Sequence, residues 1–443
     1  MRLLAGLACA ILSLAVASSA SAQSIAGQWQ AIWHDAGDRH IIVTVEKTSN
    51  GHLKAVWYDL FRAGDPNPAS EVTLNRGVFS FSIPSRGSSY EGRISSDGRT
   101  ITGAITDGID STPLDLKRPS PGDVWPLPVS HHPPPIFVTT RDGIKIEVID
   151  YGGHGQGLVF IPGLGNTASV FDQFAPRFLA KHHVFAMTRR GVGNSDRPNP
   201  TDIANYSAAR LGDDVVDVID ALKLIRPVLA GWSMGGEELS SVGSHHPEKV
   251  SGLIYLDAAY DYAFYAPGNV IDATTNLAAD LNALRAKIDQ ITGASTVGDA
   301  QSVTIIDDLL KNNLPDLEVD LKAAREVQNI VAKTPAAKPP LPKKSVMFQV
   351  SDAIMKGVEQ FTDVKPPILA IFAVDEPLPP GWTVEQQGAY QQLLAMGDEQ
   401  IKRFEKDYPS ARVVRIAHAQ HAVFMSNSDE VQREMDNFMD QLR

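Results

Sequence analysis

Residues 228–236 read Val-Leu-Ala-Gly-Trp-Ser-Met-Gly-Gly, and the rest of the chain is best understood from this stretch. An apolar strand leads into Gly-x-Ser-x-Gly, and a helical pattern begins at Glu237. This strand–turn–helix context is the one that a nucleophile elbow requires. Gly231 and Gly235 leave room where a Cβ atom would clash in so sharp a turn. Ser233 is therefore the candidate nucleophile, and the chain has to supply a base, an acid and an oxyanion hole.

Strands and helices alternate on both sides of this stretch, which predicts a mostly parallel sheet with right-handed crossovers. A hairpin over 136–151 comes first. We then expect strands at 158–161, 183–187, 227–230, 250–256, 368–374 and 412–416. We expect helices at 169–181, within 203–224, at 237–246, around 384–407 and at 429–442.

Residues 261–363 interrupt the alternation and have a helical pattern, with helices expected at 274–291, 304–313 and 316–331. Pro315 should separate the last two, since a helix interior tolerates proline poorly. An insertion at this point lies over the carboxyl ends of the strands, where α/β sheets bind ligands. We therefore expect a helical cap.

The chain before residue 136 divides into three parts. Residues 1–22 have a positive start, an apolar run and an Ala-x-Ala site, which predicts a signal peptide cut after Ala22 and a secreted or periplasmic protein. The single cysteine, Cys9, lies within it, so the mature chain would have no disulfide, thiolate nucleophile or Cys-ligated metal. Residues 23–118 show short alternating strands with turn signals, typical of a small β-barrel or sandwich. Residues 119–135 are a stiff, proline-rich linker.

Two side chains could complete a Ser, acid, His order with Ser233. His421 lies in the loop after the strand 412–416 and is the preferred base; its rival is His418, which still belongs to the strand end. Asp375 ends the strand 368–374, from which it could orient the His421 imidazole, so it is the preferred acid. Asp257, at the end of the preceding strand, is the rival acid, and Glu376 is a weaker one.

From residue 136 to the end the sequence resembles the α/β-hydrolase superfamily. The resemblance rests on 160–165 (Phe-Ile-Pro-Gly-Leu-Gly), 190–195 (Arg-Gly-Val-Gly-Asn-Ser), 231–236, 372–375 (Phe-Ala-Val-Asp) and 421–424 (His-Ala-Val-Phe). It implies an α/β-hydrolase fold with a helical cap, in which the order Ser, acid, His is the expected one. The segment 23–118 resembles, more weakly, the lipocalin-like β-domain that precedes some bacterial hydrolase domains.

The oxyanion hole requires two backbone N–H groups, which we expect from Met234, after the nucleophile, and from Leu164. Relatives usually have His-Gly where this chain has Pro162-Gly163. The backbone donor survives that change, but the hydrogen bonds of the histidine do not. The pair Arg189-Arg190 is interpreted as surface or structural ion pairing and not as an anion site.

Composition limits the partners. The 443 residues carry a formal net charge of −12, which argues against a nucleic-acid partner. No later apolar run is long enough to span a membrane, and no motif indicates a cofactor or a metal site. A small-molecule ester or amide is the expected substrate, and the oligomeric state is unknown.

Three functions fit these features. The first is a serine hydrolase that cleaves a carboxylic ester through an acyl-enzyme. The second is an iminopeptidase-like peptidase or amidase, which an amine-binding site among the cap carboxylates would favour. The third is a non-catalytic protein that binds a small ligand on the same fold.

Overall fold

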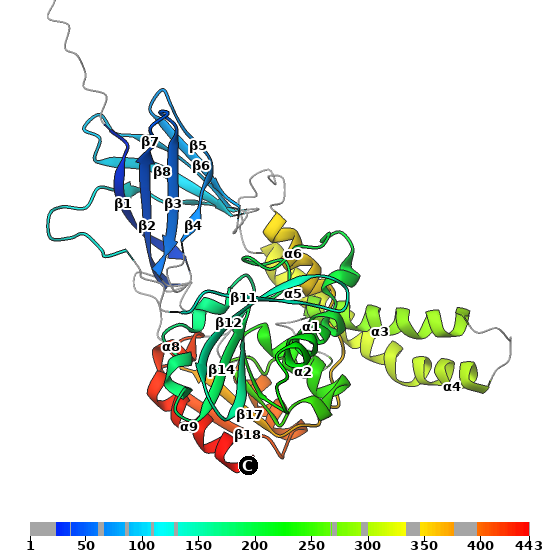
Figure 1. Cartoon of the computed structure of the whole chain (residues 1–443). Helices are drawn as coiled ribbons and strands as arrows, with labels where there is room; N and C mark the ends of the chain where they lie inside the picture. Colours follow the sequence, from blue (N-terminus) through cyan, green and yellow to red (C-terminus); the bar gives the residue numbers. More distant parts are fainter. Residues whose placement is uncertain are drawn as a thin grey trace, which may run out of the picture.

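The computed structural model describes residues 24–35, 37–60, 66–84, 88–107, 110–127, 132–265, 267, 273–293, 300–333, 346–375 and 397–442. Outside these residues lie the expected signal peptide, Cys9, Glu376, residues 128–131 of the expected linker, and residues 384–396 of the helix expected around 384–407. Within them the chain forms two β-sheets, one before and one after the proline-rich segment (Figure 1).

The N-terminal sheet is antiparallel throughout and barrel-like. Its strands are β1 (Gly27–Asp35), β2 (Gly37–Lys47), β3 (Leu53–Asp59), β4 (Asn67–Pro68), β5 (Ser70–Asn75), β6 (Val78–Ile83), β7 (Ser88–Ile94), β8 (Thr100–Asp107), β9 (Asp110–Pro113) and β10 (Leu116–Lys117). They run β4-β3-β2-β1-β10-β8-β7-β6-β5, with β9 on β8. Side chains alternate between the interior and solvent, as strand geometry requires. Trp29, Trp33 and Trp57 all belong to the buried core.

The second sheet carries the elbow. Its strands are β11 (Ile136–Thr139), β12 (Lys145–Gly153), β13 (Gln156–Ile161), β14 (His182–Met187), β15 (Val228–Trp232), β16 (Gly252–Leu256), β17 (Ile368–Val374) and β18 (Arg412–Ala417), in the order β11-β12-β14-β13-β15-β16-β17-β18. The strands from β14 to β18 are parallel, and the hairpin β11–β12 adds antiparallel to β14. The predicted mostly parallel sheet is confirmed.

Helices cover both faces of this sheet. α1 (Ala208–Ala221) and α2 (Gly235–His245) bury apolar faces in one core cluster, and α9 (Ser428–Gln441) does so in another. α1 begins at Ser207, whose side chain accepts a hydrogen bond from the Arg210 N–H at 3.3 Å. Short helical turns complete the layer: η4 (Ile203–Tyr206), η5 (Pro247–Lys249) and α8 (Val423–Ser426). A further helix spans residues 397–407.

The predicted helix at 169–181 is wrong. The structure has two short 3-10 helices instead, η2 (Ala168–Phe171) and η3 (Ala175–Phe178). Pro176 lies in the first turn of η3 and has no N–H to continue an α-helix from the preceding residues. The apolar face was nevertheless identified correctly, because Phe171, Phe174 and Phe178 are all buried.

The insertion after β16 is helical, as predicted. It contains α3 (Ala273–Gly293), α4 (Ala300–Asp308), a π-helical turn (Leu309–Asn313), α5 (Leu314–Lys333) and α6 (Val346–Lys356). α3 and α4 extend away from the sheet (Figure 1).

The expected break at Pro315 is absent, because the helical segments run on from 300 to 333. Pro315 lies in the first turn of α5, directly after the π-helical turn, where its missing N–H is tolerated. Among the residues described, none of the helices combines the length and the apolar character needed to cross a bilayer.

Candidate active site

Ser233 occupies the turn between β15 and α2 with φ of 51°, in the left-handed region that non-glycine residues seldom adopt. A Cβ atom on Gly231 would lie 2.6 Å from the carbonyl oxygen of Gly235. One on Gly235 would lie 2.6 Å from the carbonyl oxygen of Ile161. Ser233 is partly exposed although Trp232 and Met234 on either side are buried. The local geometry is therefore that of a nucleophile elbow.

His421 lies in the loop between β18 and α8, and its side chain is about half exposed. This loop is tied to the elbow through the residue before the serine. The indole Nε1 of Trp232 donates a hydrogen bond to the His421 carbonyl at 3.0 Å, and the two rings lie 5.5 Å apart. The rival His418 is exposed, with Nδ1 3.2 Å from the carbonyl oxygen of Asp375.

The acid that contacts His421 is Asp257. The Nδ1 of His421 lies 2.7 Å from Asp257 Oδ2, which corrects the expectation that Asp375 orients the imidazole. Asp375 is exposed beyond the end of β17, and its carbonyl faces His418 instead. β16 and β17 are parallel neighbours, so Asp257 and Asp375 lie at adjacent strand ends. The path of the loop that carries His421 determines which of the two aspartates the imidazole contacts.

Several donors converge on the Asp257 carboxylate, which is 4% exposed. The Tyr260 hydroxyl donates to Oδ1 at 2.6 Å, and the Ala373 N–H donates to the same oxygen at 3.0 Å. These two donors hold the carboxylate in a fixed position at the end of β16. An ionised carboxylate accepts hydrogen bonds only, so with Asp257 ionised the donor of this contact is the Nδ1–H of His421. Tyr260, three residues after the aspartate, has no sequence signal that would have marked it.

The loop after β13 lies against the elbow. A Cβ atom on Gly163 would lie 3.1 Å from the Cβ of Ser233, so only glycine fits there without displacement. The side chains of Leu164 and Met234 pack in one hydrophobic cluster. Within the described part of the chain, the backbone N–H groups of these two residues have no hydrogen-bond acceptor. The Leu164 N–H therefore belongs to the loop that lies beside the serine, and the Met234 N–H follows the serine directly.

The two arginines after β14 are buried, so a surface role is excluded and structural pairing is confirmed. Arg190 is fully buried and pairs with Asp214 and Asp142. Arg189 is 2% exposed and pairs with Glu238 on α2, while its other nitrogens contact the loop after β13.

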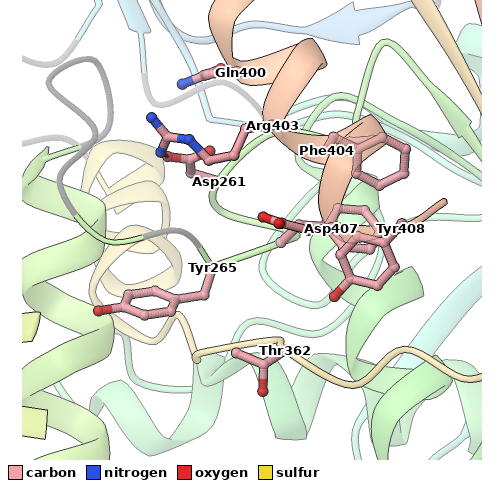
Figure 2. A pocket seen from close by; sticks show the side chains of 10 residues that line it. Asp261, Tyr265, Thr362, Gln400, Arg403, Phe404, Asp407 and Tyr408 are labelled. Atoms are coloured by element: carbon pink, nitrogen blue, oxygen red, sulfur yellow. Dashed lines mark ion pairs between the residues drawn. The ribbon is translucent and has the colours of Figure 1, made fainter. Parts of the chain in front are cut away.

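A small cavity of about 180 Å³, lined by apolar and polar side chains, lies near the acid side of the site. Figure 2 shows its wall, formed by the segment after Asp257 and by the helix over 397–407. Arg403 and Asp261 form an ion pair across part of it at 4.0 Å. Neither Ser233 nor His421 lines this cavity, so it is not the space above the nucleophile.

A buried carboxylate pair lies next to this cavity in the cap. Asp280 of α3 and Asp320 of α5 are 2% and 0% exposed, and the Tyr265 hydroxyl donates to both, at 2.5 and 3.3 Å. The Gln360 amide also donates to Asp280, at 2.7 Å. Burial, together with the neighbouring Asp320, raises the pKa of Asp280 to about 6. These two carboxylates are therefore buried between helices of the cap and are not exposed on a helix surface.

Comparison with known proteins identifies the family to which this chain belongs. A family model described as "Alpha/beta hydrolase family" matches residues 158–434, more than half of the chain. The chain is 31% identical over 134 residues to the AB hydrolase superfamily protein YisY of Bacillus subtilis, covering 30% of this chain and 48% of that protein. It is 30% identical over 115 residues to 3-oxoadipate enol-lactonase 2 of Acinetobacter baylyi, covering 25% and 42%. The aligned stretches thus span less than half of the length of these relatives.

Among solved structures, the chain is similar to the crystal structure of E-2-(acetamidomethylene)succinate hydrolase. The identity is 19%, the TM-score is 0.42, and the alignment covers 69% of this chain and 99% of the other. The α/β-hydrolase fold predicted from the sequence agrees with the family match.

Proposed function

Because the chain belongs to the alpha/beta hydrolase family, we propose that it is a serine hydrolase that cleaves a carboxylic ester through an acyl-enzyme. Ser233 is the nucleophile, His421 the base and Asp257 the acid. The observation that carries the proposal is the distance of 2.7 Å between His421 Nδ1 and Asp257 Oδ2. His421 lies on a loop that is hydrogen-bonded to Trp232, the residue before Ser233. Relatives whose names describe a lactonase and a hydrolase support the reaction class.

In the proposed reaction the hydroxyl of Ser233 attacks the ester carbonyl as His421 Nε2 removes its proton. The tetrahedral oxyanion accepts hydrogen bonds from the N–H groups of Leu164 and Met234. His421 then protonates the alcohol that leaves, and the acyl group remains on Ser233. Water, deprotonated by His421, then attacks the acyl carbonyl. The bond from this carbon to Ser233 Oγ breaks, His421 returns the proton to that oxygen, and the acid is released.

Asp257 holds the imidazole in the tautomer that this sequence needs, and its charge stabilises the imidazolium that forms. Its own position is fixed by Tyr260 and by the Ala373 N–H, so the imidazole meets a carboxylate that does not have to reorganise.

A fluorophosphonate probe tests the nucleophile. The probe should label the wild-type protein once, and peptide mass spectrometry should locate the adduct on Ser233. Ser233→Ala should abolish labelling and the turnover of p-nitrophenyl acetate, while circular dichroism and the melting temperature stay close to wild type. Labelling elsewhere, or activity that survives in S233A, would contradict the assignment. An unlabelled and inactive wild-type protein would favour a ligand-binding role.

A second candidate function is an amidase or iminopeptidase-like peptidase. This function requires a carboxylate in the cap that binds the substrate amine, and the pair Asp280 and Asp320 is the candidate that we propose to test. Turnover of aminoacyl-anilides, compared with p-nitrophenyl esters of two to twelve carbons, separates the two functions. A loss of anilide turnover in Asp280→Asn, with ester turnover unchanged, would support the peptidase assignment. A protein that hydrolyses the esters but none of the anilides would exclude it.

A further inference from the structure

Arg189 is a buried cation whose donors are divided between a carboxylate and a loop. It follows β14 by two residues and is 2% exposed. Its Nε donates to Glu238 on α2. Its Nη2 donates to the carbonyl oxygen of Pro162 at 3.0 Å, and its Nη1 donates to that of Gly163 at 3.3 Å. One guanidinium therefore joins α2 to two successive peptides of the loop beside Ser233.

The second of these peptides contains the expected oxyanion donor. The Gly163 carbonyl and the Leu164 N–H belong to one planar group, in which C=O and N–H point in opposite directions. Holding the oxygen of Gly163 on Arg189 therefore fixes the direction in which the Leu164 N–H points. The Asn166 N–H donates to the same oxygen at 3.2 Å, and the Asn166 side chain donates to the Leu164 carbonyl at 3.2 Å.

We propose that Arg189, supported by Glu238, is a positioning residue that orients the Leu164 N–H toward the oxyanion. The inference rests on the proposed function. Hydrogen bonds from a cation to the Gly163 oxygen also polarise that peptide, which strengthens its N–H as a donor. Pro162 has no N–H and no side-chain donor with which to anchor this loop, and Arg189 holds the loop through the carbonyl oxygens of Pro162 and Gly163.

The neighbouring Arg190 provides a matched comparison. It is equally buried and cationic, yet it pairs with Asp214 and Asp142 and donates to the Asn205 carbonyl. Among the described residues, its hydrogen bonds go to these three partners and not to the loop over 162–165. Loss of Arg190 removes a buried ion pair without touching the oxyanion loop. A purely structural role for Arg189 would make the two substitutions behave alike.

The test compares Arg189→Met with Arg190→Met, with active sites counted by fluorophosphonate titration and rates measured on p-nitrophenyl acetate. Both variants should lose thermal stability. In R189M the kcat per titrated site should fall about 10- to 100-fold while KM stays within about threefold, since the lost contact acts on the transition state. In R190M the kcat per titrated site should stay within about twofold of wild type.

Two further variants test the mechanism of the effect. Leu164→Pro removes the N–H itself. Adding R189M to L164P should therefore lower kcat per titrated site by less than about a further twofold. Arg189→Lys keeps a positive charge beside Glu238 but cannot span both carbonyls, so it should restore the melting temperature more fully than kcat. Any of three results would overturn the proposal. The first is an equal kcat per site in R189M and R190M, and the second is an effect of R189M on KM alone. The third is a double variant whose loss of kcat equals the product of the L164P and R189M losses.

Failure of the proposed function has a different result. In that case the wild-type protein would show no label on Ser233, and both proposals would fall. Failure of the Arg189 role alone would leave labelling and turnover intact in every Arg189 variant that folds.

Discussion

Glu237, the third residue of α2, is a carboxyl group in an unfavourable place. It is fully buried, and neither of its oxygens has a donor among the described residues. Burial is the main reason that its pKa is raised well above the usual range; the neighbouring Glu238 raises it further and Arg189 opposes the shift. A group whose pKa is higher in the folded state takes up a proton on folding, and its contribution to stability is lost as the pH rises toward the folded pKa.

Glu237→Gln should therefore become more stable, relative to wild type, as the pH increases from about 4.5 toward neutrality. The glutamine amide is neutral at every pH. The wild-type carboxyl group, as the pH rises, has either to retain its proton or to carry a buried charge, and both lower the stability of the folded state. The slope is bounded by about 1.4 kcal/mol per pH unit for one proton. Melting temperatures at pH 5, 6, 7 and 8 measure the effect, with Glu248→Gln on the exposed η5 turn as the control. A difference that does not change with pH would contradict this account.

The sequence identifies some site residues and not others for a local reason. Ser233 and His421 are marked by motifs with fixed neighbours, and the structure brings their loops together through Trp232. Asp257 and Asp375 cannot be distinguished in this way. Each follows a parallel strand, and each has positive φ, of 48° and 52°. Only the three-dimensional course of the His421 loop separates them.

At the scale of elements, the cap is joined by polar contacts as well as apolar ones. The pair Asp280 and Asp320 connects α3 to α5, with Tyr265 and Gln360 as donors. The pKa of Asp280 is raised to about 6, mainly by burial and then by Asp320. The folded cap therefore retains a proton that the unfolded chain would release between about pH 4 and pH 6, and its stability declines as the pH rises through that window.

Asp280→Asn should stabilise the cap above pH 6 and have little effect near pH 4, because asparagine imitates the protonated carboxyl and still accepts from Tyr265. Hydrogen exchange of the α3 and α5 amides at pH 5 and pH 7.5 measures this directly. Asp308→Asn on α4 is the control with the opposite sign: Asp308 is partly exposed, and its hydrogen bond to Lys287 lowers its pKa. Equal protection in D280N and wild type at pH 7.5 would contradict the prediction.

Regular elements were predictable where apolar periodicity is long and uninterrupted. The strand at 368–374 was placed at its observed bounds, and β15, β16 and β18 within two residues. The two errors both involve proline. Pro176 limits its segment to 3-10 turns. Pro315, in contrast, is accommodated in the first turn of α5, directly after a π-helical turn. Proline restricts its own backbone in both places, and the surrounding packing decides the outcome.

At the scale of the whole molecule, the proline-rich segment contacts both of its neighbours. Near its start, Trp125 stacks on His40 of β2, with the rings 4.4 Å apart. Its backbone also exchanges hydrogen bonds with Gln28 and Gln30 of β1. Further on, His132 approaches Asp172 at 3.9 Å, beside the second sheet. The first part of the segment is therefore bound to the N-terminal sheet.

These contacts predict where the chain can be divided. A fragment over residues 132–443 keeps His132 and should fold, bind the fluorophosphonate probe and turn over p-nitrophenyl acetate at close to the full-length rate. A fragment over 23–127 should be more stable than one over 23–118, because it retains Trp125. Solubility, circular dichroism and melting temperature decide the matter. An insoluble 132–443 fragment would indicate a core shared between the two sheets.

We also propose that the mature protein is exported to the periplasm or the medium after cleavage behind Ala22. Expression of the full chain in a bacterial host should yield a product in the periplasmic fraction whose intact mass corresponds to a start at Gln23. A cytoplasmic product that retains residues 1–22 would contradict this.

The central claim is that Ser233, His421 and Asp257 act together. It is tested most directly by kcat/KM of Asp257→Asn and Asp375→Asn on one p-nitrophenyl ester, per fluorophosphonate-titrated site. We predict a loss of about 10³- to 10⁴-fold in D257N, where the amide can no longer hold the Nδ1–H tautomer, and a change within about twofold in D375N. A large loss in D375N with near-normal turnover in D257N would contradict the account.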